Sequence, residues 1–279
     1  MKRTVAFACA GMLLVLLLLG VAGCTVTPFD GLTVEILDVG QSDCTLITTR
    51  DAVLMIDSGT VSQRHTVQAA LEARGIERID LLVLTHPHED HIGNARMLLE
   101  AYTVGALILP PTQTDDPGYR LICESAERCG VPIDIAASGD VWSLGGAQLA
   151  VLSAEGVGED PNNGSLVLRL TFGETRFLFT GDNERERELL LVESLPAEEL
   201  RCDFLKAGHH GSADSTVAEL LEAVAPKHAA ISCGKENSCG FPAQEMLERL
   251  REYGVTWHRT DTEGDLCYRS DGQRIWFEE

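Results

Sequence analysis

The chain has 279 residues, 44% of them hydrophobic, which is enough for one sizeable α/β domain with a full core or for two small domains. Its formal net charge of −21 makes it strongly acidic. This charge favours solubility, and it disfavours tight binding of DNA or RNA through the phosphate backbone unless a local basic patch overrides the average.

The N-terminal segment has the pattern of an export signal. Lys2 and Arg3 precede an apolar run over 5–21, and small residues then lead to Cys24. The sequence Val21-Ala22-Gly23-Cys24 resembles the lipobox of bacterial lipoproteins, in which the cysteine becomes the lipidated first residue. An uncleaved transmembrane anchor is the alternative, although the apolar run is at the short end for spanning a bilayer. We therefore predict a signal peptide at 1–23, a short tether at 24–31 that is lipid-anchored through Cys24, and a domain at 32–279, exported to the outer face of a bacterial cytoplasmic membrane.

The first elements of the domain are short strands. β-Branched or apolar runs at 32–38, 44–48 and 52–57, separated by turn residues, predict an antiparallel meander. Helical periodicity follows over 65–74 and ends at Gly75. A buried strand is then expected over 80–85, and a helix from His91 to about Ala101.

Between that strand and that helix lies an unusual segment, THPHEDHIGN at 85–94, with three histidines and two carboxylates in six residues. Residues two apart on an extended segment point the same way, so His86 and His88 can present their imidazoles to one metal ion. Asp90 and His91 lie where the chain turns into the helix, which directs them to a second ion nearby. Imidazole and carboxylate ligands together suit zinc, with manganese or iron where oxygen ligands dominate. Histidines that only cap a helix or sit in a loop are the alternative.

The second half of the chain predicts a second sheet with helices outside it. Neighbouring strands indicate another antiparallel sheet, and the last two strands flank a hairpin turn at Asp271-Gly272. Two sheets with helices outside are the natural architecture. The expected strands lie at 106–109, 141–144, 148–152, 165–172, 176–180, 204, 229–232, 256, 265–270 and 273–277, and the expected helices at 117–129, 184–192, 216–224 and 243–253.

Two of these strands are followed by residues of the types that commonly bind metals. FLFTGD at 177–182 delivers the carboxylate of Asp182 after a glycine turn, and FLKAGHHGS at 204–212 delivers His209 and His210. Loops at the ends of a rigid scaffold commonly carry functional side chains. These segments and the histidine segment therefore predict one metal site.

HPHEDH, TGD and KAGHHGS together resemble the metallo-β-lactamase superfamily of metallo-hydrolases. LDVGQSD at 37–43, MIDSG at 55–59, NNGSLVL at 162–168 and ISCGK at 231–235 are similar, more closely, to the hydrolase domain attached to the competence protein ComEC and to its stand-alone relatives. The resemblance covers nearly all of residues 32–277. It implies an αββα sandwich, with two mixed sheets and one or two divalent metal ions at the sheet edges.

The resemblance also implies roles for single residues. Asp57 is expected to orient a histidine through its other ring nitrogen, with a plain turn residue as an equal alternative. Asn163 and Ser165 are expected beside the site. The implied ligands are His86 and His88 for the first ion, Asp90 and His91 for the second, Asp182 as a bridge or a ligand of either, and His209 to complete the set.

Two departures from the family pattern stand out. β-Lactam-hydrolysing members have a histidine between the first cluster and the later acid, whereas no histidine lies between His91 and Asp182 here, so β-lactamase activity is not expected. The ComEC-like subgroup has a Gly-His-Pro step where this chain has Gly240-Phe241-Pro242. If that histidine is a ligand in relatives, water, His210 or the thiolate of Cys239 would have to take its place.

The predicted function is that of a membrane-anchored, extracytoplasmic metallo-hydrolase, a phosphodiesterase or phosphoesterase that uses a metal-activated hydroxide. Asp90 or Asp182 would orient the hydroxide or accept its proton. Lys206 and Ser212 lie beside the ligand loop and are candidates for binding a substrate anion, with a helix N-cap as the stronger alternative for Ser212.

The predicted cofactors are one or two divalent ions, zinc first and manganese as the alternative. The predicted substrates are phosphoesters, small or on a surface polymer such as teichoic acid, while the negative charge disfavours nucleic acid. The competing hypothesis is a metal-containing binding or scaffold lipoprotein whose catalysis is weakened because Phe241 replaces an expected histidine.

Overall fold

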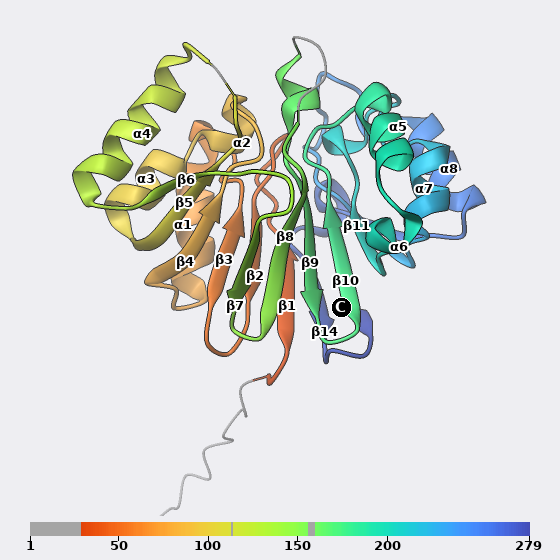
Figure 1. Ribbon diagram of the computed structural model, residues 1–279, viewed down its shortest axis with the longest axis horizontal. Helices are drawn as coiled ribbons and strands as arrows, with labels where there is room; N and C mark the ends of the chain where they lie inside the picture. Colours follow the sequence, from red (N-terminus) through yellow and green to blue (C-terminus); the bar gives the residue numbers. More distant parts are fainter. Residues whose placement is uncertain (1–28, 113, 156–159) are drawn as a thin grey trace, which may run out of the picture.

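The computed structural model describes residues 29–279 except 113 and 156–159. Two mixed β-sheets pack face to face, and helices cover the outer face of each (Figure 1). This arrangement is the αββα sandwich that the sequence predicts. The predicted signal peptide, the anchor Cys24 and the first part of the tether lie outside the described residues. Within the described ranges, no helix combines the length and the apolar character that a membrane span needs.

The first sheet has the strand order β15-β14-β1-β2-β3-β4-β5-β6. β1 to β3 form the predicted antiparallel meander, whereas β3 to β6 run parallel. Along β1, the side chains of Leu32, Val34 and Ile36 are buried and alternate with partly exposed ones, the pattern of a strand with one face on the core. The strands are β1 (Leu32–Ile36), β2 (Thr45–Thr48), β3 (Val53–Ile56), β4 (Arg78–Val83), β5 (Thr103–Leu109), β6 (Ile133–Ile135), β14 (Leu266–Ser270) and β15 (Ile275–Glu278).

The second sheet has the order β13-β12-β11-β10-β9-β8-β7. The predicted antiparallel pairing is confirmed for β7 to β10, but β10 to β13 are parallel. Parallel neighbours need a crossover connection, and helices between these strands supply it. The strands are β7 (Val141–Leu144), β8 (Ala147–Ser153), β9 (Val167–Phe172), β10 (Thr175–Phe179), β11 (Phe204–Lys206), β12 (His228–Ile231) and β13 (Thr256–Arg259).

The predicted helices are present with one correction, and two short helices, α6 and α9, were not predicted. The single helix expected from His91 to about Ala101 is two helices, α2 and α3, interrupted at Gly93 and Asn94. A Cβ on Gly93 would lie 2.5 Å from the backbone nitrogen of Val61, and the Asn94 side chain donates to two carbonyls of the same loop, those of Ser58 and Thr60. Packing on that loop therefore breaks the helix. The helices are α1 (Arg64–Ala73), α2 (Glu89–Ile92), α3 (Ala95–Ala101), α4 (Pro117–Cys129), α5 (Arg185–Ser194), α6 (Ala197–Leu200), α7 (Ala218–Val224), α8 (Gln244–Glu252) and α9 (Thr260–Glu263), with short 3₁₀ turns η1 (Val61–Gln63), η2 (Pro161–Gly164) and η3 (His209–Gly211).

The C-terminal hairpin joins the two halves of the chain. β14 pairs antiparallel with β1, so the last strands complete the first sheet although the second sheet precedes them in the sequence. The fully buried Tyr268 on β14 donates its hydroxyl to the carbonyl of Ala229 on β12, a bond of 3.0 Å between the sheets. Apolar side chains of both inner faces, among them Phe177 and Phe204, fill the space around it.

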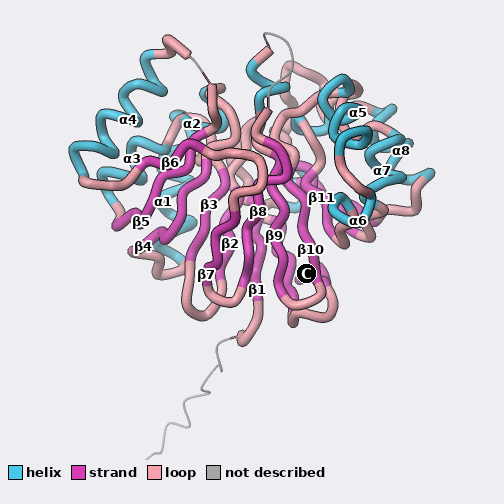
Figure 2. Tube along the Cα trace, viewed as in Figure 1, coloured by secondary structure: helices cyan, strands magenta, loops and turns pink. Residues whose placement is uncertain are grey.

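The predicted metal-binding segments leave the sheets at one common edge. The loops after β3, β4, β10 and β11 meet at the edge of the sandwich drawn at the top of Figure 2. Parallel strands have their carboxyl ends on the same side, and β3 with β4 and β10 with β11 are parallel pairs. The sheet topology therefore brings the loops from both halves together.

Candidate metal centre

The histidine segment at 85–94 follows β4 and supplies the first side chains of the site. His86 is fully buried, and its Nε2 lies 3.1 Å from Nδ1 of His88. His88 has an extended backbone (φ −67°, ψ 145°) directly before α2, so the two imidazoles converge as the alternation on an extended segment requires.

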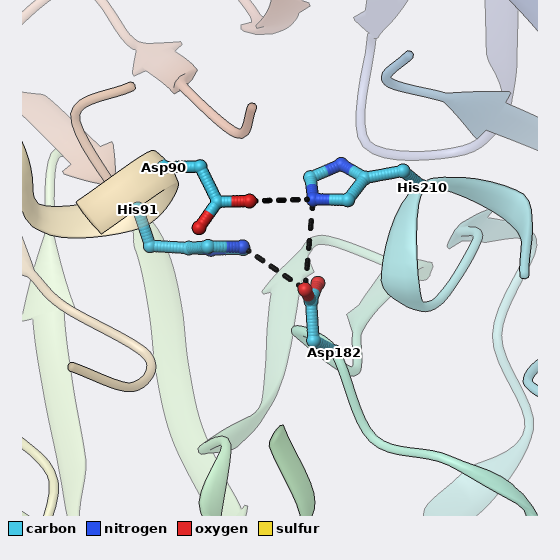
Figure 3. Close-up of side chains that lie close together, drawn as sticks. All are labelled: Asp90, His91, Asp182 and His210. Carbon is cyan, nitrogen blue, oxygen red and sulfur yellow. Dashed lines mark hydrogen bonds and ion pairs between the residues drawn. The ribbon is translucent and has the colours of Figure 1, made fainter. Parts of the chain in front are cut away.

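Four side chains from three segments form a compact cluster of potential ligands. One atom each of Asp90, His91, Asp182 and His210 lies within 4.8 Å of the others (Figure 3). Oδ2 of Asp182 is 3.2 Å from Nε2 of His91 and 3.5 Å from Nε2 of His210. Nε2 of His210 is also 3.3 Å from Oδ2 of Asp90. The cluster joins the first sheet, through α2, to the second sheet.

The Asp182 carboxylate is the centre of a wider set. The same Oδ2 lies 3.9 Å from Nε2 of His86 and 3.8 Å from Nε2 of His209. The structure therefore places three of the predicted ligands, His86, His91 and His209, and also His210 around the Asp182 carboxylate.

The two adjacent histidines of η3 take different places. His210, expected beside the site and considered as a substitute for the missing histidine, belongs to the four-residue cluster. His209 has its Nε2 3.8 Å from Asp182, stays partly exposed and lies against Phe241, at 5.5 Å between ring centroids. Both residues have positive φ, 44° for His209 and 51° for His210. This rare backbone conformation turns the second imidazole inward.

Asp57 makes the contact that its predicted role needs. Its Oδ2 lies 2.8 Å from Nδ1 of His91, and its carboxylate accepts hydrogen bonds from the backbone and the hydroxyl of Thr85. A carboxylate on Nδ1 leaves Nε2 of His91 to face Asp182. Asp57 itself has a φ of 59°, which is uncommon outside glycine and often marks a functional position.

Asn163 and Ser165 lie behind Asp182 and shape its turn. The Ser165 hydroxyl accepts a hydrogen bond from the backbone N–H of Asp182, and Asn163 Oδ1 accepts one from the N–H of Glu184. Gly181 has a φ of +54°, and a Cβ there would lie 2.6 Å from Cβ of Ser165. This close approach explains the glycine before Asp182, and it gives the two polar residues a supporting position.

Lys206 and Ser212 do not fit the predicted contacts with a substrate anion. Lys206 is buried, and its ammonium lies 2.7 Å from Oδ2 of Asp43. Ser212 is also buried, and its hydroxyl accepts from the N–H of Asp214 in a local turn. The N-cap alternative fails for Ser212 too, because α7 begins only at Ala218. Cys239 is exposed and belongs to neither cluster of potential ligands found among the described residues.

The buried carboxylates and imidazoles of the cluster shift one another's pKa values. Burial opposes the charged form of His91, but the carboxylates of Asp182 and Asp57 outweigh it and raise its pKa well above the ordinary value. Burial also opposes protonation of His210, yet Asp182 and Asp43 raise its pKa to about 10. Burial would raise the pKa of Asp182, but His91 and His210 hold it well below its usual range.

These residues fit a divalent metal ion. Imidazole and carboxylate are the ligand types of zinc, and mixtures richer in oxygen suit manganese or iron. Oδ1 of Asp182 is buried and makes no hydrogen bond within the part of the chain that the structure describes. A buried acceptor without a partner costs about 1–3 kcal/mol, a cost that a bound cation would remove.

Comparison with known proteins gives matches along most of the chain. Residues 37–235 match the family model described as the metallo-beta-lactamase superfamily. ComE operon protein 3 of Bacillus subtilis is 35% identical over 257 residues, covering 85% of this chain and 33% of that protein. Recombination protein 2 of Haemophilus influenzae is 32% identical, and the match covers 84% of this chain and 28% of that protein. Competence protein ComA of Neisseria gonorrhoeae is 31% identical, and the match covers 86% of this chain and 33% of that protein. The chain thus spans about a third of the length of these relatives.

Solved structures share the fold at low sequence identity. The metallo-beta-lactamase fold protein YhfI from Bacillus subtilis has a TM-score of 0.59 at 11% identity, covering 89% of this chain and all of that one. CmlA, a diiron beta-hydroxylase from Streptomyces venezuelae, has a TM-score of 0.59 at 17% identity, covering 89% and 54%. At these identities, the likeness is one of fold.

Proposed function

Because the chain belongs to the metallo-beta-lactamase superfamily, we propose that it is a metal-dependent hydrolase that cleaves phosphodiesters outside the cytoplasm. The observation that carries the proposal is the position of Asp182, whose Oδ2 lies within 4 Å of nitrogen atoms of four histidines. Burying so many titratable groups around one carboxylate is costly unless they serve a bound ion or a reaction.

A divalent ion held by this cluster would supply Lewis acidity, which lowers the pKa of water and polarises a phosphoryl oxygen. The protein residues then divide the remaining work. Asp182 is buried, whereas 35% of the Asp90 side chain is exposed, so Asp90 is the carboxylate that solvent and substrate reach. We propose that Asp90 orients the attacking water and accepts its proton. Asp182 connects the ligands of the first sheet, Asp90 and His91, with His210 of the second.

The substrate class is a proposal as well. The relatives' names refer to competence and recombination, which is a reason to include a nucleic acid among the test substrates. The charge of −21 favours smaller or less densely charged phosphodiesters, including those of surface polymers. We do not propose β-lactam hydrolysis, since no histidine lies between His91 and Asp182, where β-lactam-hydrolysing members have one.

We also propose that Cys24 carries a lipid that anchors the domain to the outer face of the cytoplasmic membrane. Residues 1–28 are not described, so this proposal rests on the signal pattern of the sequence alone. Mass spectrometry of the protein extracted from membranes tests it, because a Cys24→Ser variant would lose the lipid mass and its membrane association.

The second candidate function is a metal-containing binding or scaffold protein. It is favoured by the contact between Phe241 and His209, since an apolar ring occupies the place beside that imidazole. In this case metal would bind but no ester would be cleaved.

Two measurements on the same preparation separate the candidates: elemental analysis of protein purified without added metal, and turnover of bis(p-nitrophenyl) phosphate. The hydrolase proposal predicts bound metal and turnover that is abolished in Asp90→Ala and His88→Ala. His65→Ala is the matched control, because His65 is exposed and lies outside the cluster. Bound metal without turnover across a broad panel of esters would refute the hydrolase and support the binding or scaffold protein. Protein without metal would refute both candidate functions.

A further inference from the structure

Asp43, in the loop between β1 and β2, is a buried carboxylate that the proposed reaction does not use. Only 4% of the residue is exposed, and its two oxygens face different partners. Oδ2 is 2.7 Å from Nζ of Lys206, and Oδ1 is 3.3 Å from Nδ1 of His210. Asp43 therefore lies directly behind one of the four clustered side chains.

The surroundings of His210 decide which ring nitrogen carries the proton when a metal is bound. Nδ1 lies 3.1 Å from the carbonyl oxygen of Ser232 as well as near Asp43, and both partners are acceptors. Nδ1 must therefore be the N–H nitrogen, which leaves the lone pair of Nε2 directed at Asp90 and Asp182.

Lys206 keeps this arrangement electrically balanced. A buried carboxylate needs a counter-charge, and the Lys206 ammonium provides it at the end of β11. The ammonium holds Oδ2 of Asp43 and leaves Oδ1 directed at the imidazole of His210.

The backbone of Asp43 ties the same loop to the other ligands. Its N–H donates to the carbonyl of Asp90 at 3.1 Å, and its carbonyl accepts from the N–H of Gly59 at 2.7 Å. Asp43 thus connects the start of α2, in the first sheet, with His210 and Lys206, in the second. Oδ2 of Asp43 is paired with Lys206, and Oδ2 of Asp57 contacts His91 and Thr85, whereas Oδ1 of Asp43 makes no hydrogen bond among the described residues and has His210 as its near neighbour.

From these contacts we propose that Asp43, held by Lys206, is a positioning residue that, together with the carbonyl of Ser232, sets the tautomer and the orientation of His210 at the metal centre. The inference rests on the proposed function in that it requires a metal to bind there. Asp57 does the same for His91, but among the described residues no lysine or arginine pairs with it. The two histidines therefore differ in the charge behind them.

Two double variants test the proposal, because a single change would leave one buried charge unpaired. Asp43→Asn/Lys206→Met removes both charges and keeps an amide oxygen facing His210, whereas Asp43→Ala/Lys206→Met removes the acceptor as well. We expect the alanine variant to bind zinc about 10–100-fold more weakly than the asparagine variant, measured by competition with a chromophoric chelator. The visible spectrum of the cobalt-substituted alanine variant should also differ, since it reports the orientation of the ligands.

Asp203→Ala/Lys227→Met is the matched control. It removes a second aspartate–lysine pair, whose charged atoms are 3.0 Å apart. This pair lies at the start of β11, whereas Lys206 lies at its end. It should leave zinc affinity and the cobalt spectrum unchanged. Equal affinities and identical spectra of the two Asp43 variants would overturn the inference. A wild-type protein that binds metal but cleaves no ester would overturn the proposed hydrolase and leave the inference standing.

Discussion

Metal binding to the metal-free protein should release about one proton from His210 at pH 8, and His91 should add to this release. The perturbation is removal of the metal with a chelator, followed by titration with zinc. Metal ligands must be neutral imidazoles, whereas His91 and His210 are held in the protonated form by the carboxylates around them. The proton count therefore reports the charge state of these two histidines before the metal binds.

The magnitude follows from the neighbours of the two rings. Burial opposes protonation of His210, but Asp182 and Asp43 raise its pKa to about 10, two units above the pH of the experiment. At about 1.4 kcal/mol per unit, deprotonating this ring at pH 8 costs about 3 kcal/mol, which the metal has to supply. The pKa of His91 is raised well above its ordinary value, against burial, by Asp182 and Asp57. Release of the His210 proton alone should therefore make the apparent affinity increase about tenfold per pH unit between pH 7 and 9, and release from His91 should steepen this dependence.

The assay is isothermal titration calorimetry in buffers of different ionisation enthalpy, in which the slope of the observed heat counts the released protons. The same pKa shift fixes the direction in which the stability of the metal-free protein changes with pH. Since the folded pKa of His210 is raised, its contribution to the stability of the metal-free protein is complete below about pH 6.5 and is lost as the pH rises through about 10. Release of less than about half a proton would refute the reasoning, because it would mean that both imidazoles are neutral before metal binds.

Three further predictions concern the supporting residues. Ser165→Ala should lower the free energy of unfolding by about 1–3 kcal/mol, because the buried N–H of Asp182 loses its acceptor; an unchanged urea midpoint would contradict this. Glu188→Gln should cost a similar amount, since two backbone N–H groups before α7 point at its carboxylate. Because burial raises the pKa of Glu188 to about 7, that difference should shrink in urea unfolding between pH 5 and pH 8, and growth would contradict the assignment. Phe241→His should raise metal content or turnover, because its ring lies beside His209, and no change in either would show that the phenylalanine costs nothing.

The parts of the fold that local patterns encode were predictable. Alternating burial in β1 and the turn residues after it predict the meander, and the alternation on an extended segment predicts that His86 and His88 converge. The carboxylate after the glycine turn at Asp182 was equally visible, because a strand end followed by a polar residue is a local signal.

The distinction between His209 and His210 was not predictable in the same way. The two residues are adjacent, so spacing cannot separate them, and both adopt positive φ, a conformation that the motif does not indicate. Lys206 was equally ambiguous, since an ammonium after a strand can face a substrate or a buried carboxylate. The Asp43 partner that decides between these lies 163 residues away in the sequence.

The sequence by itself determined the class of the protein, the order of most strands and helices, and the segments that carry imidazoles and carboxylates, because periodicity, turns and short motifs act over a few residues. Only the tertiary structure decided that β14 closes the first sheet, that His210 enters the cluster, and that Asp43 and Lys206 stand behind it. These features depend on contacts between segments far apart in the chain, such as the hydrogen bond from Ser232 to Ser42 across 190 residues, for which no local pattern exists.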